Sequence, residues 1–167
     1  MFPATYQVRP HEAASTLVSQ QLAAFRAAFS HVDMSYARSK NLTPYDVLRI
    51  ASMIEREARV PGDRAKVSAV IYNRLHRSMS LGIDATILYH LGSWTATIHE
   101  SDLTDPEPYN LRVHTGLPPT PICNPGLASL QAAARPAHDD YLYYVAVPGQ
   151  AAQYFTASYA AFKAHGG

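Results

Sequence analysis

A fully specified helix start near residue 43 is the strongest constraint on how this chain folds. Thr43 can cap a helix through its hydroxyl group, Pro44 suits the first helical position, and Asp46 stands three residues after the cap. These signals predict a helix over residues 44–59. At about 100° per residue, one side of that helix is an apolar stripe that must be buried. The stripe consists of Val47, Ile50, Ala51, Ile54 and Ala58.

The same helix carries two glutamates within the run ASMIEREA, residues 51–58. Glu55 lies about 80° to one side of the apolar stripe and Glu57 about 80° to the other, so the two carboxylates diverge. Glycosidases with a pair of carboxyl groups hold them about 5 to 9.5 Å apart, which makes this pair unsuitable. Both side chains also fit solvated helix charges, with Glu55 four residues before Arg59. Helix geometry does not choose between Glu55 and Glu57.

Composition narrows the range of partners. The 167 residues suit a single domain with a buried core. A net charge of +1, 47% hydrophobic residues and the lack of a basic run argue against nucleic acid and fit a neutral or mixed ligand such as glycan. We expect a soluble chain, because no apolar run reaches the 18 or so residues of a membrane span and the start lacks a signal-peptide pattern.

Apolar periodicity predicts two further long helices. An alanine-rich helix is expected at about 12–29, packed in the core through Val18, Leu22, Phe25 and Phe29. After a break at Pro61, Asp63 is expected to cap a helix at about 64–77.

The second half of the chain predicts shorter elements. Residues 80–125 are mixed, and the proline-rich run at 108–126 indicates a surface loop or a pocket wall. Asn124 and Pro125 predict the cap and first turn of a helix to about 134, and the runs 141–147 and 153–156 predict a hairpin, followed by a short helix. The whole predicts an α+β fold: one predominantly helical domain, residues 1–167, with a C-terminal β-hairpin and a long proline-rich pocket loop.

Several blocks, in this order, resemble one known family. They are ASMIEREA, VIYNRLHRSMSL (70–81), DAT (84–86), PYN (108–110), GLPPTPICNPGLASLQAA (116–133) and YLYYVA (141–146), and the opening FPATY (2–6) also matches. Their order and spacing along nearly the whole chain resemble the endolytic murein transglycosylases, the MltG/YceG-like family.

The resemblance implies a reaction. Members cleave the β-1,4 bond between N-acetylmuramic acid and N-acetylglucosamine within peptidoglycan strands, without water, and leave 1,6-anhydro-N-acetylmuramic acid ends. The family's catalytic glutamate matches Glu55. One carboxyl group suffices, because the C6 hydroxyl of the sugar attacks the anomeric carbon while Glu55 acts first as acid and then as base. The apolar neighbours Leu48 and Ala51 are expected to favour the protonated form.

Polar residues within these blocks are the candidates for binding sugar, because hydroxyl groups and a developing oxocarbenium ion need polar partners. Each also has a structural alternative as a cap, a turn former or a packing residue. Asn73 is the best placed of them, since it lies within a helix and has no capping role. The candidates are Asn73, Asp84, Thr86, Tyr109, Asn110 and Asn124. We expect neither a metal nor a cofactor.

Three positions depart from the family pattern. Gly82 and Ala85 stand where the family commonly has a glutamine and a proline, and the family tends to have a histidine near Gln153. These departures bear on the exact sugar subsites more than on the reaction, because Glu55 and Asn73 are present.

The resemblance also implies a setting. Family members carry an N-terminal membrane helix and a LysM-like domain before the catalytic region, and neither precedes Met1, so we expect residues 1–167 to be the catalytic domain alone. The implied location is the extracytoplasmic face of the bacterial cytoplasmic membrane. The expected partners are glycan strands and the peptidoglycan polymerases, with membrane contact only through the missing segment.

Other classes of function have less support. Cys123 as a nucleophile, with His114 or His138, matches no signature, and eight scattered histidines without HExxH do not indicate a metalloenzyme. A glycan-binding or scaffold module without catalysis stays open because of the three departures. A hydrolase using Glu55 with Asp84 is the nearest enzymatic alternative, and its product would end in a reducing sugar.

Overall fold

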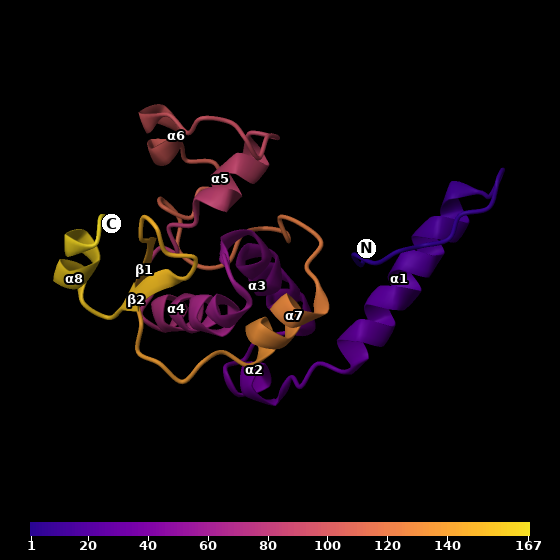
Figure 1. Ribbon diagram of the computed structural model, residues 1–167, viewed down its shortest axis with the longest axis horizontal. Helices are drawn as coiled ribbons and strands as arrows, with labels where there is room; N and C mark the ends of the chain where they lie inside the picture. Colours follow the sequence, from indigo (N-terminus) through magenta and orange to yellow (C-terminus); the bar gives the residue numbers. More distant parts are fainter.

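The computed structural model describes residues 1–167 and shows a helical body with one small sheet (Figure 1). The predicted α+β class is confirmed. In chain order the elements are α1 (Ala14–Ser30), α2 (Ser35–Ser39), α3 (Pro44–Glu57), the 3-10 turn η1 (Pro61–Asp63), α4 (Arg64–His76), α5 (Asp84–His90), α6 (Glu100–Thr104), α7 (Leu127–Ala134), β1 (Tyr143–Ala146), β2 (Gln153–Thr156) and α8 (Tyr159–Ala164).

Helix α3 is the centre of the body. Its predicted start is confirmed, because the Asp46 amide donates to Thr43 Oγ1 at 3.2 Å and the Thr43 amide donates to Asp46 Oδ2 at 2.8 Å. Helices α4, α5 and α7 pack around α3. The helix ends at Glu57, two residues earlier than predicted, because Ala58 and Val60 take extended backbone before Pro61. Its fully buried apolar residues are Val47, Ile50, Ala51, Met53 and Ile54.

The first long helix is not core packing as predicted. Helix α1 has no buried residue, and Val18 and Leu22 are 44% and 43% exposed. Only Phe25 and Phe29 pack against the core, and Figure 1 shows α1 extending away from the body like an arm. An apolar face at helical spacing indicates that a helix packs against other elements, but it does not show how much of that face is covered. Here only Phe25 and Phe29 meet the core.

Two predicted helix caps are wrong. Asp63 makes no cap bond to α4; it is buried at the end of η1, and its carboxylate accepts from the Gln153 amide at 3.1 Å. Helix α7 begins at Leu127 after Gly126, not at Asn124 and Pro125, and it has no side-chain cap. In the first case a long-range hydrogen bond replaces the local one.

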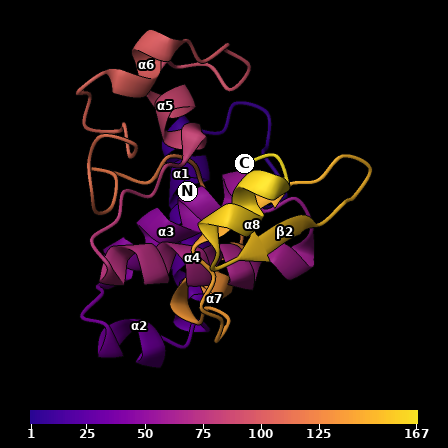
Figure 2. The same cartoon turned by 90° about the vertical axis from the view of Figure 1, so that its left-hand side faces the viewer.

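The predicted hairpin and closing helix are confirmed. Strands β1 and β2 pair antiparallel, with Tyr143 opposite Thr156 and Ala146 opposite Gln153. Helix α8 packs on both strands, and Figure 2 shows this unit in front of α4, with α5 and α6 above it. None of the helices is both long enough and apolar enough to cross a membrane.

Truncating the buried contact between α7 and α3 is expected to lower stability strongly. Leu130 on α7 is fully buried, so Leu130→Ala should reduce the free energy of unfolding by about 2–5 kcal/mol in urea denaturation. Val18→Ala on the exposed side of α1 is the control and should change it by less than about 0.5 kcal/mol. Equal losses in the two variants would contradict the packing described for α1.

Candidate active site

A cavity of about 460 Å³ lies beside the last residue of α3. Segments far apart in the sequence form its wall: the end of α3, helix α4, the loop before α5, the segment after α6, strand β1 and helix α8. It is lined by Glu57, Arg74, Ser80, Leu81, Gly82, Asp84, Arg112, Tyr143, Tyr144, Val145, Tyr159 and Phe162. A concave site that gathers several charged groups and aromatic rings is the usual form of a ligand site.

Glu57 has the most perturbed carboxyl group in this cavity. Burial raises the pKa of Glu57, and the nearby Asp84 carboxylate raises it further. The Tyr144 hydroxyl donates to Glu57 Oε2 at 2.8 Å and opposes that rise, as does the Ala85 amide. Because Glu57 is the last residue of α3, the negative end of the helix dipole also disfavours its charged form. A carboxyl group in this position can hold a proton and deliver it.

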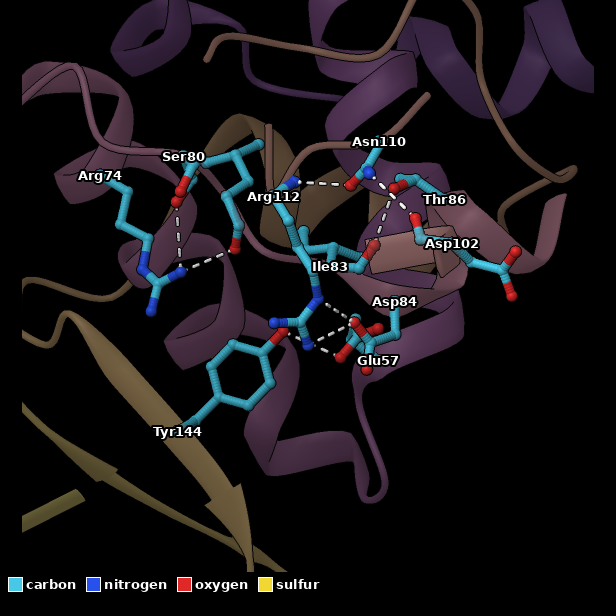
Figure 3. A network of polar contacts seen from close by, with 11 residues as sticks. Glu57, Arg74, Ser80, Ile83, Asp84, Thr86, Asp102, Asn110, Arg112 and Tyr144 are labelled. Carbon is cyan, nitrogen blue, oxygen red and sulfur yellow. Dashed lines mark hydrogen bonds and ion pairs between the residues drawn. The ribbon is translucent and has the colours of Figure 1, made fainter. Parts of the chain in front are cut away.

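Asp84 and Arg112 form an ion pair beside Glu57. Arg112 donates to Asp84 Oδ1 from Nε at 2.8 Å and from Nη2 at 2.6 Å. The Asn110 side chain accepts from the Arg112 amide at 3.1 Å and so holds the segment that carries the guanidinium. Figure 3 shows Asp84, Arg112 and the Tyr144 ring converging on Glu57. The cavity therefore presents an acid next to a carboxylate whose charge is partly balanced.

Arg74 holds the cavity walls together. Its Nε donates to the Leu142 carbonyl at 2.7 Å, and its Nη1 donates to the Leu81 carbonyl at 2.7 Å. These bonds join α4 to the residue before β1 on one side and to the loop before α5 on the other. Figure 3 shows the contacts of Arg74 with the loop before α5. Burial lowers the pKa of Arg74, yet a guanidinium remains charged at neutral pH.

Glu55 lies in different surroundings. Its side chain is exposed, and Oε2 accepts from Ser129 Oγ at 2.7 Å and from the Gly126 amide at 3.0 Å. Both donors belong to α7 or to the residue before it, so this carboxylate ties α3 to α7. Glu55 does not line the Glu57 cavity.

Of the six predicted sugar-binding residues, Asp84 alone lines the Glu57 cavity. Asn73 donates to the carbonyls of Asp139 at 2.9 Å and Tyr141 at 2.8 Å, and it faces a separate hollow of about 290 Å³. Thr86 is fully buried, and its hydroxyl donates to the Ile83 carbonyl at 2.7 Å.

The other three predicted residues also lie away from Glu57. Asn110 is buried and donates to the carbonyls of Asp102 and Asp105, at 3.0 and 2.8 Å. Tyr109 shares a 2.7 Å hydrogen bond with Thr120 within the proline-rich loop. Asn124 is exposed and lines another hollow, of about 510 Å³, beside α1. The bonded residues among them stabilise the scaffold that carries the cavity.

The three departures fall in different places. Gly82 lines the cavity with φ +60°, and an added Cβ there would come within 3.3 Å of Arg74 Nη1, so glycine suits this turn. Ala85 is buried in the first turn of α5, and its amide acts on Glu57 in a way that a proline, which lacks an N–H, cannot. Gln153 lies outside the cavity.

The surroundings of Cys123 do not support the hypothesis that this residue is a catalytic nucleophile. Burial and then the Glu55 carboxylate raise the pKa of the Cys123 thiol to about 11, so little thiolate exists at neutral pH. The His114 ring bonds the Pro106 carbonyl at 2.8 Å, and the His138 ring packs edge-on against Tyr36. No three histidine, cysteine, aspartate or glutamate side chains come together as a metal site would require.

Comparison with known proteins identifies the family. The model of the YceG-like family matches residues 1–166. The chain belongs to the YceG-like family. A crystal structure of a YceG-like protein from Listeria monocytogenes superimposes with a TM-score of 0.80 at 30% identity, over 98% of this chain and 52% of that one.

Two relatives of this YceG-like chain are named endolytic murein transglycosylase. The protein from Bacillus subtilis is 34% identical over 146 residues, which are 87% of this chain and 41% of the relative. The protein from Streptococcus pneumoniae is 34% identical over 151 residues, which are 87% of this chain and 27% of the relative. The chain thus spans less than half the length of either protein.

Sequence reasoning did not single out Arg74, Arg112 or Tyr144, and it gave Glu57 no role. Arg74 and Tyr144 lie inside the resemblance blocks, and Arg74 directly follows the candidate Asn73. Arg112 stands two residues after the PYN block, and no spacing signal links it to Asp84. Its role depends on a contact between residues 28 positions apart.

The pKa of Glu57 is expected to respond in opposite directions to two substitutions. Tyr144→Phe removes a hydrogen bond to the carboxylate and should raise it further, whereas Asp84→Asn removes a nearby negative charge and should lower it. NMR titration of ¹³C-glutamate-labelled protein measures both shifts, with Glu57→Gln to assign the signal. Tyr45→Phe at the far end of α3 is the control and should leave the titration unchanged. Shifts of the same sign would contradict this account of the cavity.

Proposed function

We propose that this YceG-like chain is the catalytic part of an endolytic peptidoglycan lytic transglycosylase. It would cleave the bond between N-acetylmuramic acid and N-acetylglucosamine within glycan strands and leave 1,6-anhydro-N-acetylmuramic acid ends. The names of the two relatives support the substrate and the reaction class. The observation that carries the proposal to individual residues is the Glu57 carboxyl group, whose pKa is raised, in the wall of a cavity of about 460 Å³.

In this proposal the proton carrier is Glu57, which replaces the earlier assignment to Glu55. The resemblance implies Glu55, which stands two residues before Glu57 in the same sequence block. An acid catalyst needs surroundings that favour its protonated form and a cavity that admits substrate. Glu57 has both, whereas Glu55 is exposed and bound to Ser129 and Gly126. Glu55 then serves as a tie between α3 and α7.

A single glutamate can carry out both proton transfers. Protonated Glu57 gives its proton to the glycosidic oxygen as the bond to the anomeric carbon breaks. The C6 hydroxyl of the same sugar attacks that carbon, and the Glu57 carboxylate takes the hydroxyl proton, so no water is consumed. Tyr144 donates to Oε2, so Oε1 would be the oxygen that exchanges the proton with the substrate. The negative charge of Asp84 favours the oxocarbenium-like transition state.

A hydrolase is the second candidate, because Glu57 and Asp84 are two carboxyl groups at one cavity. In that reaction Asp84 would activate a water molecule or attack the sugar. The ion pair with Arg112 opposes this, since the guanidinium contacts Asp84 Oδ1 from both Nε and Nη2 and already engages that oxygen. The two candidates differ by one water in the product.

The proposal also includes the setting that the resemblance implies. The chain would work at the extracytoplasmic face of the cytoplasmic membrane, on strands newly made by peptidoglycan polymerases. A segment outside residues 1–167 would hold it there. The greater length of the two relatives is compatible with such a segment.

Mass spectrometry of uncrosslinked peptidoglycan strands tests the reaction and the residue together. The unmodified chain should produce internal fragments with anhydro ends. Glu57→Gln should lower the rate by at least about 100-fold, because the amide fills the same volume but delivers no proton. Glu55→Gln is the matched control on the same helix and should retain activity within about tenfold, because it loses part of a structural tie and no proton donor.

Each of the other possible results of this experiment contradicts one part of the proposal. Loss of cleavage in Glu55→Gln with an active Glu57→Gln variant would return the role of proton carrier to Glu55. Fragments heavier by one water would establish hydrolysis in place of transglycosylation. No fragments from the unmodified chain would overturn the proposed activity of this chain.

A further inference from the structure

Three aromatic rings form a continuous surface at the mouth of the Glu57 cavity. Tyr143 comes from β1, and Tyr159 and Phe162 come from consecutive turns of α8. The Tyr143 ring lies 5.2 Å from Phe162 and 5.6 Å from Tyr159, measured between ring centroids. All three residues line the cavity, and we call them the aromatic shelf.

The shelf lies outside the hydrophobic core, although its contacts also join α8 to β1. None of its three members belongs to the hydrophobic core or packs against it as a partly buried neighbour. Helix α8 has no buried residue, and Tyr159 is 59% exposed. Single exposed aromatic residues are common, but three in mutual contact at the mouth of a charged cavity are typical of a binding surface.

The cavity offers two kinds of surface to a ligand. The lining contains the charged groups of Glu57, Asp84 and Arg112 and also the three aromatic rings. A pyranose ring matches this combination, because its axial C–H groups form an apolar face and its hydroxyl groups form a polar edge. A purely apolar ligand would leave the charged groups without partners, at a cost in desolvation.

We propose that the aromatic shelf is a sugar subsite, in which a pyranose ring of the glycan strand stacks on Tyr159 next to the bond that Glu57 protonates. This inference rests on the proposed function and adds the position of a neighbouring sugar.

Tyr159 is the member with a free face. The Tyr143 ring already has the Arg74 guanidinium at 5.2 Å and stacks on Phe162, so these contacts occupy it. They also attach the shelf to α4 through Arg74. The Tyr159 ring is tilted against both neighbours and leaves more than half of its surface to solvent.

Isothermal titration calorimetry with uncrosslinked peptidoglycan strands tests the subsite. The parent protein carries Glu57→Gln so that the strands remain intact. Adding Tyr159→Ala should weaken binding about tenfold, the size of one aromatic stacking contact, and adding Tyr159→Phe should not. In the cleavage assay with Glu57 present, Tyr159→Ala should raise KM and change kcat little.

Tyr45→Ala is the matched control. Tyr45 is 48% exposed and has the Arg49 guanidinium over its ring, but it lies at the first turn of α3, about 18 Å along the helix from Glu57. Adding Tyr45→Ala to the parent should leave strand binding unchanged. Equal weakening by Tyr45→Ala and Tyr159→Ala would overturn the subsite, because the loss would then not depend on position.

The remaining outcomes separate the subsite from the proposed function. Binding by the parent that Tyr159→Ala leaves unchanged overturns the subsite alone. Absence of both binding by the parent and cleavage by the unmodified chain overturns the proposed function and the subsite with it.

A second measurement keeps Tyr159 in place, so that the subsite is tested even if Tyr159→Ala does not fold. In ¹³C-tyrosine-labelled parent protein, the strands should shift the ring signals of Tyr159 and leave those of Tyr45 in place. Shifts at Tyr144 without any at Tyr159 would overturn the shelf as the place where the sugar stacks.

Discussion

Burial of helix α3 against α4, α5 and α7 is the constraint on which the rest of this structure depends. Five apolar residues of α3 are fully buried, so the elements that cover them are positioned relative to this helix. The capping box at Thr43 and Asp46 defines where the helix starts, and extended backbone before Pro61 ends it at Glu57. The last turn thereby carries one carboxyl group to each side of the core, Glu55 toward α7 and Glu57 toward the hairpin.

The two carboxyl groups differ because of what those neighbouring elements supply. Near α7, Glu55 meets an amide and a hydroxyl donor and stays exposed. At the other side, Glu57 meets the Tyr144 hydroxyl and lies near the Asp84 carboxylate in the cavity wall, and burial raises its pKa. Arg74 maintains this second environment, because its guanidinium joins α4, the loop before α5 and the hairpin. Proton chemistry at Glu57 would therefore depend on a half-buried cation in the wall of the same cavity.

Local sequence signals predicted those helices and strands whose formation depends mainly on neighbouring residues. The start of α3, the extent of α4 and the C-terminal hairpin followed from caps, apolar spacing and β-branched or aromatic runs. Predictions failed where the position of a residue depends on contacts with residues far away in the sequence. Asp63 bonds the Gln153 amide rather than capping α4, and α1 lies outside the core although it has an apolar face. Thr86 and Asn110, expected to bind sugar, use their polar atoms on nearby carbonyls.

The sequence by itself determined the α+β class, the central helix, the resemblance to one family and a short block that contains the reactive carboxyl candidates. Only the tertiary structure decided which glutamate lies in a cavity and which charged and aromatic groups surround it. The physical reason is that a carboxyl group becomes an acid through its surroundings. Here these come from β1, α5, α8 and Arg112, which lie between 27 and about 100 residues from Glu57 along the chain. Spacing within a single helix carries no information about such contacts.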